Sequence, residues 1–102
     1  MENWTPIELD KLSSLIREGS SKMSDIQKQI WELISIEPEK WTEEEFGREG
    51  GGFWVVAIAG KKVIWYNDIE EGFNVSSYID YGQLDAYGAE QDELQWAINK
   101  IK

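Results

Sequence analysis

Residues 53–68 read FWVVAIAGKKVIWYND and predict a β-hairpin. Two runs rich in β-branched and aromatic residues, 53–59 and 62–68, flank the dipeptide Gly60-Lys61. Such runs are typical of strands. Glycine at the first position of a two-residue loop is typical of a type II′ hairpin turn. We therefore expect an antiparallel pair that forms the centre of the fold.

Counting back from this turn places large apolar side chains on both faces of the hairpin, because successive residues of a strand point to opposite sides. The face expected to carry helices holds Trp54, Val56, Ile58, Val63 and Trp65. The opposite face holds Phe53, Val55, Ile64 and Tyr66. Either helices and a long loop cover this second face, or it is an exposed aromatic patch of the kind found at binding surfaces and dimer contacts.

Two amphipathic helices are predicted before the hairpin. The first begins with Thr5 as its cap and Pro6 at the first helical position, and it ends at Gly19. The second begins at Ser24 and is bounded by Pro38, because the residue before a proline leaves the helical region. The apolar stripe expected on this helix consists of Ile26, Ile30, Leu33 and Ile34.

Weaker patterns complete the predicted fold. Residues 40–46, 73–78 and 83–87 have strand character, and a helix is expected from Asp92 onward. The apolar stripe of that helix is Leu94, Ile98 and Ile101. The resulting order, α-α-β-β-β-β-α, describes an α+β protein: an antiparallel sheet of about four strands, two N-terminal helices and one C-terminal helix. We expect a single domain over residues 1–102.

The charge of the chain is strongly negative. Twenty acidic residues oppose 10 basic ones in 102 residues, for a net charge of −10. Phosphate backbones and anionic membranes would be repelled, so we expect neither nucleic acid nor membrane as a partner. Eight acids lie between Val63 and Asn99, where there is no lysine or arginine: Asp68, Glu70, Glu71, Asp80, Asp85, Glu90, Asp92 and Glu93. We expect one end of the fold to carry a negative field, although solubility alone would also explain the acidity.

Residues for catalysis are scarce. The chain has no histidine and no cysteine, which removes thiol nucleophiles, serine triads and the usual zinc sites. A carboxylate pair such as Asp68 and Glu70 would need a cleft that so small a fold offers little room for. We therefore expect a protein that is not an enzyme and carries no cofactor. A divalent-cation site among Asp68, Glu70 and Glu71 is a remaining alternative.

The location of the protein follows from what its sequence lacks. The N-terminus, MENWTPIELDKL, has neither the basic nor the apolar region of a signal peptide. No apolar run reaches the roughly 20 residues that span a bilayer. The absence of cysteine suits a reducing compartment. The sequence predicts a cytoplasmic protein.

Acids and aromatic residues alternate after the hairpin, and this mixture predicts a surface for a basic protein partner. Charge would speed the encounter, and buried aromatic side chains would supply most of the affinity. The expected contact surface consists of Tyr66, Asp68, Glu70, Glu71, Phe73, Tyr78, Asp80 and Asp85. The alternatives are a homodimer joined through the second face of the sheet and a small ligand- or cation-binding domain.

In size and surface chemistry the chain resembles small bacterial immunity proteins, which neutralise toxins such as nucleases by covering their basic active sites. The glycine-rich lead from Phe46-Gly47 to Gly52-Phe53 also resembles the immunity-associated superfamily of cell-wall-synthesis regulators. The first resemblance implies an inhibitor of a basic toxin or enzyme. An uncharacterised bacterial family fits the sequence equally well, and no functional residue is carried over from either resemblance.

Overall fold

A four-stranded antiparallel sheet organises the computed structural model, which describes residues 5–45, 47 and 51–101. The strands lie side by side in chain order, β1-β2-β3-β4. The predicted α+β class and element order are confirmed. The elements are α1 (Leu9–Ser21), α2 (Asp25–Ile34), β1 (Ser35–Trp41), β2 (Phe53–Ala59), β3 (Lys62–Asn67), β4 (Gly72–Ser77), α3 (Leu94–Ala97) and a short 3-10 turn, η1 (Ile98–Lys100).

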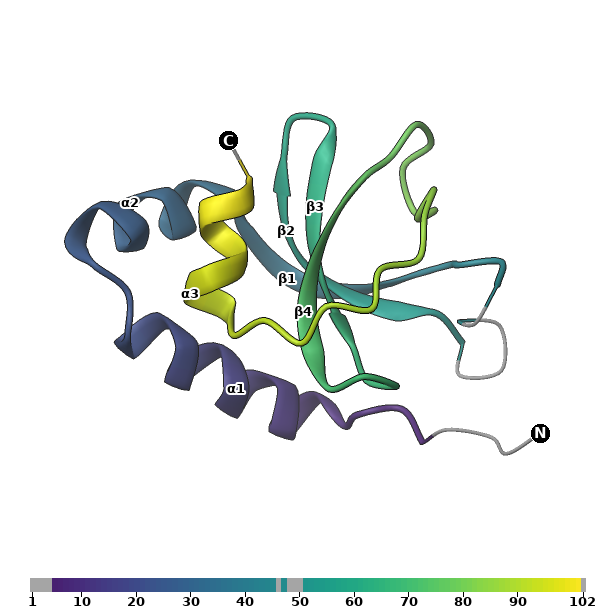
Figure 1. The fold of residues 1–102 in the computed structure, drawn as a ribbon, viewed down its shortest axis with the longest axis horizontal. Coiled ribbons are helices and arrows are strands. Elements are labelled where there is room, and N and C mark those ends of the chain that lie inside the picture. The colour runs from purple at the N-terminus through teal and green to yellow at the C-terminus, as the bar shows by residue number, and fades with distance from the viewer. Residues whose placement is uncertain (1–4, 46, 48–50, 102) are drawn as a thin grey trace.

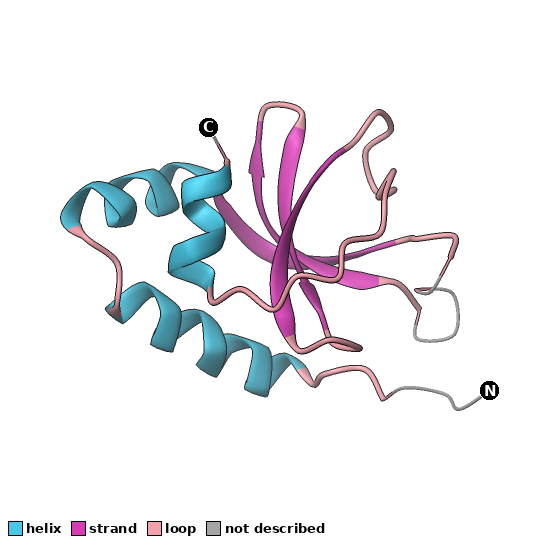
Figure 2. Cartoon of the chain, viewed as in Figure 1, coloured by secondary structure: helices cyan, strands magenta, loops and turns pink. Residues whose placement is uncertain are grey.

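The two faces of the sheet are covered by different kinds of structure. All three helices lie against one face, and the irregular segment 78–91 crosses the other (Figures 1 and 2). Each covering encloses its own group of buried apolar residues. The second face is therefore interior, and the exposed aromatic patch that was one of the two expectations for it is absent.

The central hairpin forms as predicted near its turn. Gly60 has a φ of +62°, whereas Lys61 is not in the left-handed region, which is the pattern of a type II′ turn. Ile58 pairs with Val63, as expected. Beyond Ala57 the register shifts, because one extra residue of β2, Val56, is accommodated in a bulge.

The bulge overturns the predicted assignment of side chains to faces. Val56 and Ala57 both contribute to the helix-side core, so the alternation of β2 is interrupted there. Trp54 and Val56 do face the helices, but three other residues predicted to accompany them lie on the opposite side: Ile58, Val63 and Trp65. Ile64 and Tyr66 make the reverse change and pack beneath the helices.

The first helix differs from its prediction at both ends. It begins at Leu9 rather than after Thr5, because the backbone of Ile7 is hydrogen-bonded to two side chains of the sheet, Asp68 and Trp54. Gly19 lies inside the helix and does not end it. A Cβ atom at Gly19 would lie 2.6 Å from the Cβ of Leu94, so this glycine allows α1 to approach α3 closely.

The second helix starts as predicted, with Ser24 and Gln27 forming a reciprocal capping box. Ile30 and Ile34 pack against the core, but Ile26 and Leu33 are exposed, contrary to the predicted stripe. Pro38 does not bound the helix directly. It lies within β1, an edge strand, where the missing N–H removes no hydrogen bond from the middle of the sheet.

The segment predicted as a strand over 83–87 is irregular. Gln83 forms only an isolated parallel bridge with Thr42. The predicted strand 40–46 corresponds to the end of β1, and its last residue, Phe46, lies outside the described residues, as does part of the predicted loop 47–52. The C-terminal helix is short, and its stripe of Leu94, Ile98 and Ile101 packs into the helix-side core as predicted.

Candidate functional site

The eight residues of the expected contact surface lie at two ends of the molecule. Tyr66, Asp68, Glu70, Glu71 and Phe73 surround the turn between β3 and β4. Tyr78 lies beside the opposite turn, where its N–H donates to Lys61 O and its hydroxyl donates to Gly60 O, each at 2.9 Å. Asp80 and Asp85 are exposed on the irregular segment that follows it. The structure therefore brings five of these residues together and separates the other three.

A groove runs between α1 and the β3–β4 turn, and it is the best-formed concavity near the predicted residues. Its wide end has a volume of about 660 Å³, and its narrow end has a volume of about 160 Å³. The two ends share Leu15, Tyr66 and Glu71. Asp68 lines only the wide end, and Phe73 only the narrow end. Glu70 belongs to the same turn but lines neither end.

The wall of the wide end is a short extended segment, residues 5–8, fastened to the sheet by side chains. The N–H of Ile7 donates to Asp68 Oδ2 at 2.8 Å. The indole Nε1 of Trp54 donates to Ile7 O at 3.3 Å. These two bonds use both polar groups of the Ile7 backbone, so the segment runs along the sheet before α1 begins. Asp68 thus has a structural role that the sequence did not reveal.

Burial alters the acid–base properties at this wall. It raises the pKa of Asp68, while the bond from the Ile7 N–H and the nearby Lys40 ammonium act in the opposite direction. Burial also raises the pKa of the Tyr66 hydroxyl, and the charges of Glu71 and Asp68 add to that effect. Tyr66 therefore stays neutral at physiological pH, and its side chain lies almost wholly buried beside the groove.

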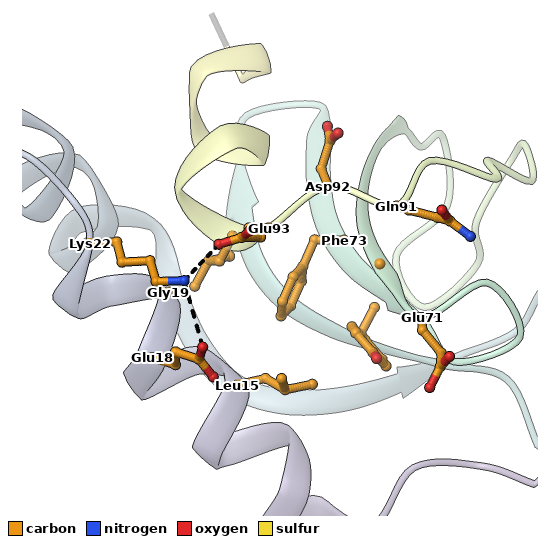
Figure 3. Close-up of a pocket in the computed structure, with 12 residues that line it drawn as sticks. Leu15, Glu18, Gly19, Lys22, Glu71, Phe73, Gln91, Asp92 and Glu93 are labelled. Carbon is orange, nitrogen blue, oxygen red and sulfur yellow. Dashed lines mark hydrogen bonds and ion pairs between the residues drawn. The ribbon is translucent and has the colours of Figure 1, made fainter.

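The rim of the narrow end carries an ion-paired lysine. Lys22 Nζ lies 3.0 Å from Glu93 Oε1 and 3.6 Å from Glu18 Oε1, joining α1 to the start of α3 (Figure 3). The bond to Glu93 raises the pKa of Lys22. The pKa of Glu93 is lowered by hydrogen bonds from Gln95 and then Lys22. Glu71 stands on the opposite wall, across Phe73 and Leu15 (Figure 3).

The groove as a whole is acidic. Six carboxylates and two lysines line its two ends. One of the six, Asp92, is ion-paired with Lys100 at 2.6 Å, and Lys22 is paired as described above. The carboxylates are Glu8, Glu18, Asp68, Glu71, Asp92 and Glu93. The acids expected to gather at one end of the fold are therefore divided, because Asp80 and Asp85 lie at the other end of the molecule.

Sequence reasoning missed the half of the groove that comes from α1. Glu8, Leu15, Glu18 and Lys22 line it, yet α1 was treated only as an amphipathic element of the core. One signal was available: Glu18 and Lys22 are spaced i,i+4, as an ion pair on one helix face would be. Nothing in the sequence indicated that this face would lie opposite the β3–β4 turn.

The side chains that line the groove are carboxylic, amino, hydroxyl, amide and apolar. Its lining contains neither histidine nor cysteine, and no group of three or more potential metal ligands occurs in residues 5–45, 47 and 51–101. The cation site considered for Asp68, Glu70 and Glu71 finds no support in those residues. Within the same described residues, no helix is long and apolar enough to cross a membrane.

At the other end of the molecule, the irregular segment 78–91 carries exposed apolar side chains. Trp41 is buried on this side and contacts Tyr78 edge to face, with ring centroids 5.1 Å apart. Tyr81 packs on Trp41 and donates its hydroxyl hydrogen to Glu39 Oε1 at 2.5 Å. Ile79 is 78% exposed. None of these residues lines the better-formed concavities of the described chain.

Comparisons with protein-family models, with curated proteins and with solved structures find no significant match to this chain.

Proposed function

We propose that this protein is a non-enzymatic binding module that receives a basic segment of a partner protein in the groove between α1 and the β3–β4 turn. An inhibitor of a basic toxin or enzyme, acting in the cytoplasm as immunity proteins do, is the specific form of this proposal. The observation that carries it is the composition of the groove: aromatic and aliphatic side chains form its floor, and six carboxylates against two lysines line it.

In this proposal, charge increases the rate of association, and burial of apolar surface supplies affinity. Exposed carboxylates such as Glu8 and Glu71 attract a basic partner over about one Debye length, roughly 8–10 Å at physiological salt, which speeds the encounter. The half-buried side chains of Pro6, Ile7 and Leu15 then offer apolar surface that a partner can remove from water. The wide end, with a volume of about 660 Å³, is large enough for several side chains of an incoming loop.

The homodimer alternative has lost the surface on which it depended. It required the second face of the sheet to be free for a subunit contact. That face is filled by Leu84, Tyr78 and Tyr87 of the same chain. The free edge of the sheet at β1 is also a poor dimer contact, since it carries Pro38 and the acidic Glu37 and Glu39.

Where a neighbouring gene encodes a basic protein, the association kinetics of that protein with this chain test the proposal. The variant Glu8→Lys/Glu71→Lys reverses two charges in the groove and thereby changes the net charge of the chain from −10 to −6. The matched control, Asp80→Lys/Asp85→Lys, makes the same change on the irregular segment. Asp68 is left unchanged, because reversing it would detach the 5–8 segment.

We expect the groove variant to associate at least tenfold more slowly at low salt, since loss of steering changes the association rate by one to three decades. The control should associate within about twofold of the unmodified protein. Equal slowing of both variants would show that only net charge matters and would refute the groove as the binding surface. Faster association of the groove variant would refute a basic partner altogether.

A further inference from the structure

We infer that the narrow end of the groove receives a single lysine or arginine side chain of the partner, and that Lys22 is an intramolecular competitor for that position. This inference rests on the proposed function, because it names the anchor residue of the same basic segment.

The shape of the narrow end suits one long side chain. Its volume of about 160 Å³ is close to the roughly 150 Å³ of an engineered cavity that binds one benzene-sized molecule. Leu15 from α1 and Phe73 from β4 form its apolar floor (Figure 3). Tyr66 also lines it. The buried rings of Tyr66 and Phe73 contact each other, with centroids 5.0 Å apart, so the floor is a firm surface.

The chemistry of the rim selects a cation at the end of that side chain. Glu71 and Glu93 stand on different walls above the apolar floor. An apolar stem with a charged head matches this layout, because lysine and arginine bury their methylene groups along apolar surface and keep the charge at the water boundary. A carboxylate and an incoming ammonium or guanidinium then form a charge-assisted hydrogen bond. A partner side chain without the stem, or without the charge, would satisfy only half of the site.

Lys22 already shows that the rim binds an ammonium group. Its Nζ is held by Glu93 and Glu18, at 3.0 and 3.6 Å. The side chains of Lys22 and Glu93 remain 47% and 44% exposed, so their pairing is of the solvated, readily exchanged kind. Glu71 makes no ion pair with any described residue. An incoming cation would therefore meet one free carboxylate, Glu71, and would compete with Lys22 for a second, Glu93.

The test uses a short probe whose binding is read by NMR. The peptide acetyl-Gly-Lys-Gly-amide is titrated into the full chain, and the amide shifts of Leu15, Phe73 and Glu93 are followed. Two matched peptides replace the lysine by norleucine, which keeps the stem and lacks the charge, or by diaminopropionic acid, which keeps the charge and shortens the stem. We expect the lysine peptide to shift these amides and to bind more tightly than either control peptide.

Substitutions separate the two roles assigned to the rim. Glu71→Gln should weaken the lysine peptide, whereas Lys22→Gln should strengthen it, each by about two- to fivefold, the scale of one exposed ion pair. Their controls make the same charge changes at the other end of the molecule: Asp80→Gln and Lys61→Gln should leave affinity unchanged. Circular dichroism checks that each variant is folded.

Two results would overturn the inference while leaving the proposed function standing. One is a lysine peptide that produces no shifts at the narrow end, or binds no better than its norleucine counterpart. The other is a Lys22→Gln variant whose affinity equals that of its Lys61→Gln control. The proposed function fails by a different measurement, the association rate of the whole partner with the Glu8→Lys/Glu71→Lys protein.

Discussion

The two faces of the sheet are both buried, but they are covered in different ways. On one face, regular helices present apolar stripes and enclose Val56, Ile64 and Phe73. On the other, a segment with no strand or helix of its own covers Phe53 and Trp65. The helices satisfy their own backbone hydrogen bonds, whereas an irregular covering must be given partners by side chains of the sheet.

Asparagines provide those partners. Asn67 Nδ2 donates to Gly88 O at 2.7 Å, and Asn74 Nδ2 donates to Glu90 O at 3.0 Å while its Oδ1 accepts the N–H of Glu90 at 2.9 Å. Both asparagines are buried. An irregular segment can therefore cover a core when side chains of the neighbouring strands make the hydrogen bonds that a paired strand would have made with its backbone.

The largest expected effect tests whether the two cores are equally well packed. Phe53→Ala removes a buried ring from the core under the irregular segment, and Phe73→Ala removes a buried ring from the core under the helices. We expect each to lower the free energy of unfolding by about 3–5 kcal/mol, the usual cost of deleting a buried phenylalanine. Urea denaturation measures both. A cost below about 1 kcal/mol for Phe53→Ala alone would show that the irregular covering is loose.

A smaller effect is expected from removing one fastening of the irregular segment. Asn74→Ala deletes the bonds to Glu90 and leaves their backbone partners without the side chain that satisfied them. The expected cost is about 2–3 kcal/mol. Hydrogen exchange should accelerate at the Glu90 amide and leave the interior of α1 protected. Ser77→Ala, on the exposed end of the same strand, is the control and should change neither.

The difference between the faces also explains how much of the fold could be predicted. The Gly60 turn, the Ser24 cap and the C-terminal stripe are local signals, and the structure confirms them. The bulge at Val56 is not local: it is needed because Val56 and Ala57 both pack beneath the helices. Segment 83–87 has the composition of a strand, but its backbone bonds to a turn at Asp80, to Thr42 in one isolated bridge and to the Ser76 hydroxyl.

The candidate site was predictable to a similar degree. Acids and rings around the β3–β4 turn were found, because they are close in sequence. The contribution of α1 depends on a contact between elements more than forty residues apart, such as the bond from the Ile7 N–H to Asp68, with a separation of 61 residues. The same bond shows why Asp68 was assigned to the surface: a carboxylate in a polar turn looks solvated until its backbone partner is known.

The pH dependence of stability probes the helix-side fastening at Asp68. Its pKa is higher in the folded protein than in the unfolded chain, because burial disfavours the carboxylate. The folded state therefore holds this proton more tightly. The contribution of Asp68 to stability is fully present below the ordinary aspartate pKa of about 4 and is lost as pH rises through the raised folded value.

Asp68→Asn removes this titration while keeping an oxygen that can accept the N–H of Ile7. The difference in unfolding free energy between Asp68→Asn and the unmodified protein should grow in favour of the variant as pH rises from about 4. Asp80→Asn, at an exposed carboxylate, should give a flat difference. If the stability advantage of Asp68→Asn grew on acidification instead, folding would lower the pKa of Asp68, and the expected direction of the shift would be wrong.

The smallest expected effects concern apolar side chains that neither covering buries. Leu33, on α2, is 85% exposed, and Ile79, on the irregular segment, is 78% exposed. Leu33→Ser and Ile79→Ser should each change the free energy of unfolding of the monomer by less than about 0.5 kcal/mol, because little apolar area returns to water. Sedimentation of the same variants distinguishes the two sides. If only one substitution changes the sedimentation coefficient, the side chain that it replaces contacts a second copy of the chain. The covering on that side of the sheet would then also be an interface between copies, whereas the other covering would not.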